Sequence, residues 1–298
     1  MAKPSPERTR VLGIGELLWD LFPDGPRLGG APFNVIANVR RLGLPAAFLT
    51  AVGDDELGRA ALAAADALDV DATFISVTPD LPTGTVEVIP DPVAGHRLEI
   101  GSPAAYESIG DPDAVVDRMA AWRPGAVVFG TLAQRSAAVH RVTRQTCLGI
   151  APGHRFYDMN LRDGTWSPEL VLDLLGLATV VKGNVDEARV LGALLRCDPD
   201  AGTLGPRLAE TYGVVAVCVT RGGDGAALWA DGALVEADGL RVDVVDTVGA
   251  GDAFAAGLLH AMLVGRPPKA AIAFANRLGA LVASRPGALP KWRPGEIG

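Results

Sequence analysis

The segment Asp246-Thr-Val-Gly-Ala-Gly-Asp-Ala-Phe254 places small residues directly before a run of apolar ones. We expect that run to form a helix over residues 253–264 that begins near Asp252. A helix start leaves several backbone N–H groups without partners and carries partial positive charge. Small residues at that point let an anion approach the backbone closely. The segment therefore predicts an anion site beside a carboxylate, although Asp252 alone fits an ordinary helix N-cap equally well.

A carboxylate beside an anion site is unfavourable unless it takes up a proton during a reaction. Transfer of a phosphoryl group to a hydroxyl needs this pairing, because a base removes the proton of the nucleophile while amides stabilise the charge on the transferred group. We therefore interpret Asp252 as the catalytic base. The backbone of Gly249, Ala250 and Gly251 forms the expected anion hole.

Outward from this segment, short apolar strands alternate with helices, which predicts an α/β fold with a mainly parallel sheet covered on both faces. The expected strands are 10–14, 46–52, 126–129, 155–158, 179–182 and 214–220, and the expected helices are 34–42, 57–68, 112–122, 136–148, 187–195, 203–212, 253–264 and 269–284. A hairpin is expected around Asp231-Gly232. The strands 83–89 and 96–100 alternate in polarity instead, which favours a small antiparallel lid with one wet face. We expect one domain over 1–298, with the lid formed by segments near 16–32 and 83–106.

The bulk composition excludes several classes of protein. The chain has 298 residues, 49% of them hydrophobic, and a net charge of −8, which disfavours non-specific binding to nucleic acid. The sequence shows neither a signal peptide nor an apolar stretch long enough for a membrane span. Three scattered cysteines form no disulfide framework. We expect a cytoplasmic protein that acts on small molecules.

A second segment, Gly29-Gly-Ala-Pro-Phe-Asn34, lies roughly two hundred residues before the first. Together the two segments resemble the N- and C-terminal signatures of the ribokinase-like (PfkB) carbohydrate kinases, and the resemblance extends from Gly15 to about Pro290. It implies a three-layer α/β/α fold with a small inserted β-sheet lid. It also implies ATP-dependent phosphorylation of a sugar hydroxyl, with Mg²⁺ and K⁺ as candidate ions.

The resemblance assigns a first set of residues to the sugar. Asp20, in Gly15-Glu-Leu-Leu-Trp-Asp20, matches an aspartate that binds sugar hydroxyls, whereas Glu16 is expected to be structural. Arg162 follows a strand, at the edge where open α/β sheets bind ligands. The full expected set of substrate residues is Asp20, Gly29, Gly30, Asn34, Ala104, Tyr106 and Arg162.

A second set is assigned to the nucleotide and its metal. Thr220-Arg-Gly-Gly-Asp-Gly225 resembles the nucleotide loop of the family. Asn184 and Glu187 match an Asn-x-x-Glu motif that holds Mg²⁺ through water, although the same pattern fits a capping box. The full expected set for ATP is Asn184, Thr220, Gly222, Gly225, Gly251 and Asn276.

A potassium site is a further implication of the resemblance, through backbone carbonyls beside the anion hole. The corresponding positions are Asp246, Val248, Val282, Arg285 and Gly287. Lys291 departs from the small polar residue of ribokinase-type members, and its ammonium would weaken or replace the ion. We therefore expect weak K⁺ dependence.

The substrate is the least determined part of the prediction. The segments Phe129–Arg135 and Tyr157–Trp166, with Gly29–Asn34, resemble fructokinases, so we expect conversion of D-fructose to fructose 6-phosphate. A 2-keto-3-deoxygluconate kinase is the main alternative, with Arg162 or Arg97 binding its carboxylate. A ribokinase, a nucleoside kinase and a non-catalytic sugar or nucleotide sensor stay open. The resemblance also suggests a homodimer through the lid.

Overall fold

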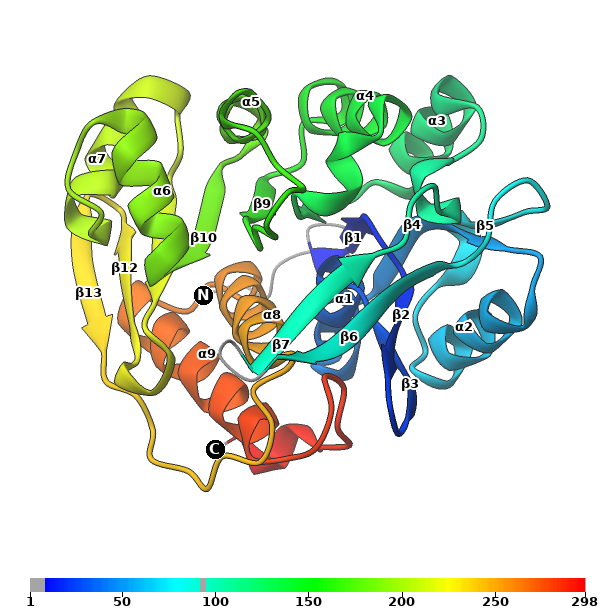
Figure 1. Cartoon of the computed structure of the whole chain (residues 1–298). Helices are drawn as coiled ribbons and strands as arrows, with labels where there is room; N and C mark the ends of the chain where they lie inside the picture. Colours follow the sequence, from blue (N-terminus) through cyan, green and yellow to red (C-terminus); the bar gives the residue numbers. More distant parts are fainter. Residues whose placement is uncertain (1–8, 92–94, 298) are drawn as a thin grey trace.

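The computed structural model describes residues 9–91 and 95–297, in which helices cover both faces of a central sheet (Figure 1). The strand order is β13-β12-β11-β10-β9-β8-β1-β4-β5. Neighbouring strands from β11 to β5 are parallel, while β12 and β13 add an antiparallel hairpin at one edge. The strands are β1 (Val11–Ile14), β4 (Ala46–Gly53), β5 (Ile75–Thr78), β8 (Ala126–Phe129), β9 (His154–Asp158), β10 (Val180–Asn184), β11 (Ala216–Thr220), β12 (Ala226–Ala230) and β13 (Ala233–Ala237). The predicted three-layer fold is confirmed.

Successive side chains of the central strands enter two different cores, as the period of two in a strand requires. Val128 and Phe156 belong to one core, whereas Val127 and Phe129 belong to the other. The first core is covered by α1 (Ala31–Arg41), α2 (Glu56–Ala67), α8 (Ala250–Leu263) and α9 (Pro268–Ala283). The second is covered by α3 (Pro112–Trp122), α4 (Ala137–Gln145), α5 (Pro168–Leu177), α6 (Val185–Leu195) and α7 (Ala201–Tyr212).

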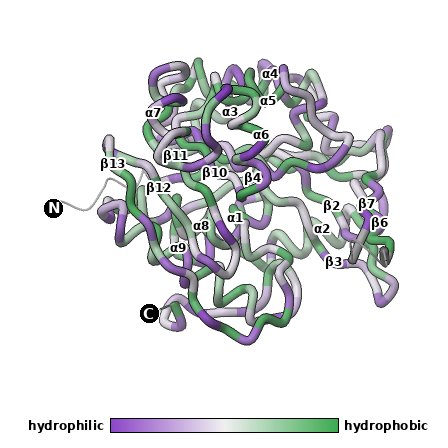
Figure 2. Tube along the Cα trace, turned by 60° about the vertical axis from the view of Figure 1, so that its left-hand side comes forward, coloured by the Kyte–Doolittle hydropathy of each residue, from purple (hydrophilic) through white to green (hydrophobic). Residues whose placement is uncertain are grey.

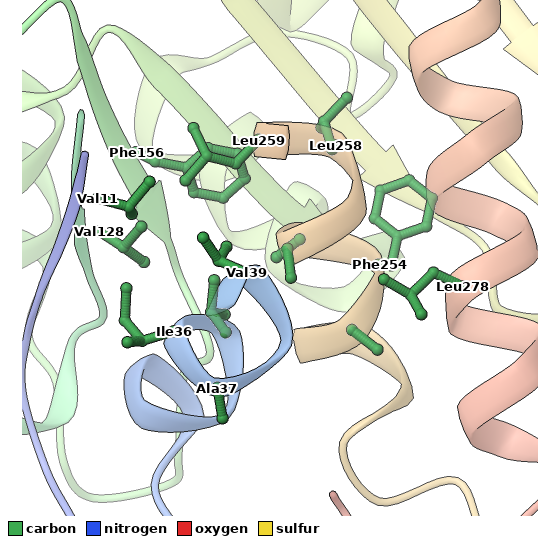
Figure 3. Packing of buried hydrophobic residues seen from close by; sticks show 14 of the residues in the cluster. Val11, Ile36, Ala37, Val39, Val128, Phe156, Phe254, Leu258, Leu259 and Leu278 are labelled. Carbon is green, nitrogen blue, oxygen red and sulfur yellow. The ribbon is translucent and has the colours of Figure 1, made fainter. Parts of the chain in front are cut away.

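Helix α8 is deeply enclosed in the first core. Residues from Ala253 to Leu259 along it are all buried, which marks a helix that is apolar on every side. It packs between α1 and α9, and Phe254 of α8 lies against Leu278 of α9 (Figure 3). The N-terminus of α8 is therefore held by close packing on several sides.

A separate small sheet stands at one side of the molecule (Figure 2). Its order is β3-β2-β6-β7, with β2 (Leu18–Phe22), β3 (Gly25–Gly29), β6 (Gly84–Asp91) and β7 (Gly95–Ile100). We refer to these four strands as the lid. The expected antiparallel pair is confirmed in β6 and β7, and β2 joins this pair by running parallel to β6 and antiparallel to β3. In the chain, β2 follows β1 and β6 follows β5. Because β1 and β5 run in the same direction in the main sheet, β2 and β6 both enter the lid from the carboxyl ends of that sheet.

Other differences concern element boundaries. Helix α1 begins at Ala31 rather than at Asn34, with Pro32 in its first turn, where a missing N–H costs little. Strand β5 and helix α5 were not expected. The start of α5 carries a recognisable signal, because the Ser167 side chain caps the helix and Pro168 follows it. Among the described residues, no helix is both long and apolar enough to cross a lipid bilayer.

Candidate active site

Two cavities meet at the carboxyl ends of the central strands. The first has a volume of about 490 Å³ and contains Asp252, and the second has about 640 Å³ and contains Asn276. Thr220, Thr247 and Gly251 line both of them. This edge of the sheet is where open α/β folds bind ligands. The arrangement provides for two ligands that come together at the start of α8.

Helix α8 begins without a side-chain cap. Its N-cap residue is Gly249, in the left-handed region at φ 76°, where an added Cβ would lie 2.5 Å from the carbonyl oxygen of Ala288. Asp252 lies in the first turn, and its carboxylate accepts a hydrogen bond of 2.8 Å from the Asn34 side chain instead of capping the helix. The alternative of Asp252 as a simple N-cap is therefore wrong.

The three amides predicted for the anion hole are not equivalent. The Ala250 N–H donates to the carbonyl of Thr247 at 3.3 Å. Within the described chain, no such bond engages the N–H groups of Gly249 and Gly251. The positive end of the α8 dipole therefore offers these two amides to an anion.

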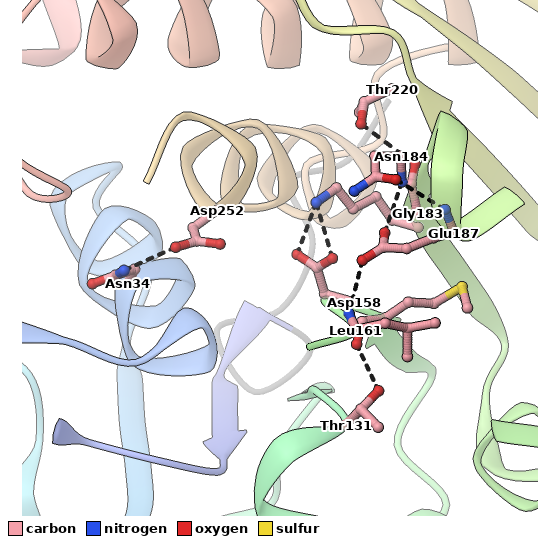
Figure 4. A network of polar contacts seen from close by, with 11 residues as sticks. Asn34, Thr131, Asp158, Leu161, Gly183, Asn184, Glu187, Thr220 and Asp252 are labelled. Carbon is pink, nitrogen blue, oxygen red and sulfur yellow. Dashed lines mark hydrogen bonds and ion pairs between the residues drawn. The ribbon is translucent and has the colours of Figure 1, made fainter. Parts of the chain in front are cut away.

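The carboxyl group of Asp252 is balanced by opposing influences (Figure 4). Burial raises its pKa, while the hydrogen bond from Asn34 and the charges of Lys182 and Arg162 lower it. The net direction is upward. A base with a raised pKa is better matched to removing a hydroxyl proton near neutral pH.

A buried ion pair that sequence reasoning missed lies beside the same amides. The Lys182 ammonium donates to both carboxylate oxygens of Asp158, at 2.9 and 3.2 Å, and both side chains are almost fully buried. Burial alone would lower the pKa of Lys182, but the charge of Asp158 raises it above its ordinary value, so the ammonium stays charged. Its nitrogen lies 3.4 Å from the position that a Cβ on Gly251 would take. The signal in the sequence was a lysine inside the apolar strand β10.

The sugar-side wall of the first cavity carries carboxyl groups and one arginine. Asp20, Glu16 and Arg162 line it, together with Gly30 and Asn34. Burial raises the pKa of Asp20 to about 6, although Arg162 opposes the shift. Seven of the expected contributors to sugar and catalysis therefore meet here, namely Asp20, Gly30, Asn34, Arg162, Gly249, Gly251 and Asp252.

Gly29 and Gly30 allow the lid to pack closely against the main body. At Gly30, φ is 110° and a Cβ would lie 2.2 Å from the carbonyl oxygen of Glu16. At Gly29, a Cβ would lie 2.4 Å from the carboxylate of Asp20. Gly30 lines the cavity, but Gly29 does not. The absence of a side chain at Gly29 therefore leaves room for the Asp20 side chain.

Ala104 and Tyr106 do not line the cavity either. Both are buried in the second core, because the chain turns inward after β7. The Tyr106 ring packs against Gly84 of β6, where an added Cβ would meet it at 2.7 Å. The structure therefore places these two residues at the base of the lid, behind the lining of the cavity.

Asn184 and Glu187 form a capping box at the start of α6. The Asn184 side-chain oxygen accepts from the N–H groups of Asp186 and Glu187, and the carboxylate of Glu187 accepts from those of Asn184 and Leu161. Both residues nevertheless line the first cavity. A carboxylate with one N–H on each oxygen retains lone pairs for a water ligand of a metal. Among the described residues, no cluster of three or more His, Cys, Asp or Glu side chains is arranged to hold a metal directly.

The second cavity collects the residues expected for the nucleotide. Thr220, Gly222, Gly225 and Asn276 all line it. At Gly225, φ is 92° and a Cβ would lie 2.1 Å from the carbonyl oxygen of Ala237, so the turn requires glycine. The Asn276 amide donates to the carbonyls of Ala237 and Asp238, at 3.2 and 3.1 Å. Its side chain thus fixes one wall of the cavity. The apolar part of the lining comes from Leu240, Val242, Val244, Phe254, Ala280 and Ala283.

The positions expected for potassium lie in two segments that run side by side. The Asp246 carboxylate accepts from the N–H groups of Val248 and Gly287, at 3.0 and 2.9 Å. The Val282 carbonyl accepts from the Arg285 N–H at 3.0 Å. The Arg285 guanidinium is engaged by the Lys291 carbonyl and by Glu296, and the Lys291 side chain is exposed to solvent.

Comparison with known proteins identifies relatives over nearly the full chain. The model of the family described as pfkB family carbohydrate kinase matches residues 26–293. The fructokinase of Escherichia coli is 30% identical over 300 residues, covering 94% of this chain and 95% of that protein. The aminoimidazole riboside kinase of Salmonella typhimurium is 30% identical over 308 residues, covering 94% and 91%.

The solved structures agree in fold. The crystal structure of fructokinase with bound ATP from Xylella fastidiosa superposes with a TM-score of 0.86 at 23% identity, covering 97% of each chain. The two signature segments, the layered fold and the family match over residues 26–293 lead to the same conclusion. The chain belongs to the pfkB family of carbohydrate kinases.

Proposed function

We propose that this kinase transfers the terminal phosphoryl group of ATP to D-fructose and forms fructose 6-phosphate. The observation that carries the proposal is the position of Asp252, whose carboxylate lies beside the open start of α8, where the two cavities meet. Fructokinases among the relatives support the choice of sugar.

The residues of the first cavity would bind and activate the sugar. Asp20 and Asn34 offer hydrogen-bond partners for hydroxyls, and Asn34 also orients the carboxylate of Asp252. Asp252 would take the proton from the reacting hydroxyl as its oxygen attacks. The amides of Gly249 and Gly251, with the Lys182 ammonium, would stabilise the negative charge that develops next to them.

The second cavity fits a nucleotide. Glycines 222 and 225 let a phosphate approach the backbone, and the Thr220 hydroxyl stands between the two cavities. The apolar wall that includes Val242 and Val244 offers a surface for a base. When bound, ATP with Mg²⁺ supplies the phosphoryl group and neutralises part of its charge. Asn184 and Glu187 would hold the water shell of that metal.

The charge of the first cavity favours a neutral sugar over an acid sugar. Four carboxyl groups line it, those of Glu16, Asp20, Glu187 and Asp252, against two cations, the Lys182 ammonium and the exposed Arg162 guanidinium. Arg97, the other candidate partner for a substrate carboxylate, is paired with Glu99 on the lid. The carboxylate of 2-keto-3-deoxygluconate would therefore meet more like charge than opposite charge. We rank fructose first, and ribose and nucleosides after it.

An ADP-release assay with Mg²⁺-ATP and a panel of sugars tests the substrate. The panel contains fructose, ribose, 2-keto-3-deoxygluconate and adenosine, and we expect fructose to give the highest kcat/KM. In Asp252→Asn, loss of the base should lower kcat at least roughly 100-fold. A wild-type rate in this variant would overturn the mechanism, and a sensor protein would show binding without turnover.

Three further parts of the proposal concern ions, assembly and location. We expect weak dependence on K⁺, so that exchanging Na⁺ for K⁺ changes the rate less than several-fold. A homodimer through the lid would protect the open edges of its sheet, which are otherwise free to pair. A cytoplasmic location is consistent with the free cysteines Cys147, Cys197 and Cys218.

A further inference from the structure

The transfer steps assigned to Asp252, Lys182 and the amides of α8 leave the buried carboxyl group of Glu16 without a part in the chemistry. Glu16 is 2% exposed and lies in the loop between β1 and the lid strand β2. It lines the sugar cavity, and its Oε2 atom is buried without a hydrogen-bond partner. The N–H groups of Glu16 itself and of Ala133 are close enough to lower its pKa, but burial outweighs them. A buried acceptor that remains unpaired is expensive and calls for an explanation.

A structural carboxylate in this chain looks different. Asp55 caps α2 and accepts hydrogen bonds from the N–H groups of Gly58 and Thr83 and from the Thr83 hydroxyl, at 2.7–2.8 Å. These partners lower the pKa of Asp55 even though burial raises it. Glu16 has the burial without those partners. These surroundings argue against a purely structural role for Glu16.

Other buried polar groups near Glu16 also lack hydrogen-bond partners. The Tyr106 hydroxyl is buried without a partner, and so are both polar atoms of the Gln134 side chain. Burial and then the charge of Glu16 raise the pKa of the Tyr106 hydroxyl, which places the two groups near each other. Gln134 follows Ala133, whose N–H also acts on Glu16. Of these groups, Glu16 is the one that lines the cavity.

We propose that Glu16 is a specificity-determining residue whose carboxylate accepts a hydrogen bond from a sugar hydroxyl other than the one that is phosphorylated. The inference rests on the proposed sugar kinase function and adds a second acidic contact to that of Asp20. The reacting hydroxyl lies at Asp252, so a hydroxyl at another carbon of the same small polyol reaches Glu16 across the cavity. A hydroxyl at that place donates the hydrogen bond that the Oε2 atom lacks, and this bond favours the ionised carboxylate.

The first test replaces Glu16 by its uncharged isostere. Hydrogen bonds to charged groups are among the stronger ones, so Glu16→Gln should lower kcat/KM for the sugar roughly 10- to 100-fold. The loss should fall on the KM for sugar, while kcat and the KM for ATP change less than about threefold. A residue that acts only on folding would change neither KM.

The decisive measurement compares deoxy sugars in both proteins. Wild type should discriminate roughly 10- to 100-fold against one monodeoxy analogue of its best substrate. Glu16→Gln should lose most of that discrimination and keep the discrimination against the other analogues, because the two changes remove the same contact. Asp55→Asn is the matched control, and it should lower the melting temperature without altering any of these ratios.

The outcomes separate this inference from the substrate proposal. If fructose is inactive but another sugar of the panel turns over, the fructose assignment fails and Glu16 is judged on the deoxy series of the active sugar. If both proteins discriminate equally against every analogue, the role of Glu16 is overturned while the kinase stands. If no sugar turns over in wild type, both proposals fail.

Discussion

At the scale of single residues, the site is a cluster of buried ionisable groups, each of which needs a partner that compensates its charge. Lys182 and Asp158 neutralise each other beside Gly251, while Asp252 relies on the amide of Asn34. Glu16 has no such partner. Burial of ionisable groups is costly, and proteins retain it where chemistry or recognition needs it.

Lys182 gives the first prediction at this scale. Because its ammonium lies next to the Gly251 end of the anion hole, Lys182→Met should lower kcat roughly 100-fold, the usual effect of losing one such donor. The KM for sugar should change little. Lys269→Met, at an exposed position of α9, serves as the control and should retain full activity.

The variant also leaves Asp158 without its counter-ion, so the fraction of folded protein must be measured by circular dichroism. Asp158→Asn, which keeps the ammonium in place with a weaker partner, should show a smaller loss of kcat than Lys182→Met. A Lys182→Met enzyme whose kcat per folded molecule equals that of wild type would remove Lys182 from the mechanism.

Glu16 gives a prediction about pH. Burial raises the pKa of Glu16 to about 7, from 4.5, so the folded protein holds a proton that the unfolded chain releases between pH 4.5 and 7. Stability therefore falls as pH rises through this window, by about 3 kcal/mol if the shift is fully realised. Glu16→Gln should remove this loss, and its free energy of unfolding relative to wild type should increase from pH 5 to pH 8.

Denaturant unfolding at several pH values measures the effect. Asp55 is the control, because its contribution to stability depends on pH in the opposite direction. Its pKa is lowered, so its contribution to stability is present above the ordinary aspartate pKa and is lost on acidification. Asp55→Asn should therefore cost more stability at pH 7 than at pH 3. Parallel curves for wild type and Glu16→Gln would contradict the shift.

At the scale of elements, the start of α8 depends on one backbone conformation. Gly249 has φ 76° and lies against the Ala288 backbone, with 2.5 Å from a hypothetical Cβ to the carbonyl oxygen. Gly249→Ala should therefore displace the first turn of α8 and lower kcat at least roughly tenfold, since small misplacements in a reacting site are costly.

The C-terminal end of α7 supplies a matched control. Gly213 has φ 72°, close to that of Gly249, but nothing lies within 4 Å of an added Cβ. Gly213→Ala should carry the same left-handed strain, about 1–2 kcal/mol, without any change in kcat. Steady-state kinetics and thermal unfolding on both variants separate strain from misplacement, and equal kcat values in the two would refute the argument.

The elements also show how far sequence reasoning reaches. The anion hole, Asp20 and the capping box at Asn184 were predictable, because each depends on a short segment at the end of one strand or the start of one helix. The Lys182–Asp158 pair and the contact from Asn34 to Asp252 join segments 24 and 218 residues apart, so no local pattern encodes them. The burial of Tyr106 in the second core was not predictable either, since its position in a motif says nothing about which way the chain turns after β7.

At the scale of the whole molecule, the main body and the lid both contribute to the lining of the first cavity. The main body supplies Asp252, Lys182 and the nucleotide cavity, and the lid supplies an apolar inner face. That face consists of Leu18, Val86, Val88, Leu98 and Ile100, all of which line the first cavity. Apolar side chains above a polyol pack on its carbon skeleton and exclude water from the reacting centre.

A substitution at Leu98 of β7 tests whether the inner face of the lid contacts the sugar. Leu98 lines the sugar cavity although it is 43% exposed, so it is the part of the inner face that closure over a sugar would bury most. Leu98→Asp would replace that contact by a further carboxylate in a cavity that four carboxyl groups already line. We expect the KM for sugar to rise roughly tenfold, which corresponds to about 1.4 kcal/mol of binding free energy.

Val77 of β5 provides the comparison, because it is 50% exposed and lies outside the cavity on the edge strand of the main sheet. Val77→Asp should leave the KM for sugar and the KM for ATP unchanged. Comparing the two variants therefore removes any effect that comes only from adding a surface charge to this acidic chain. If the two variants raise the KM for sugar equally, long-range charge accounts for the effect. A rise confined to Leu98→Asp places the lid over the bound sugar, because only contact with the substrate distinguishes the two exposed side chains.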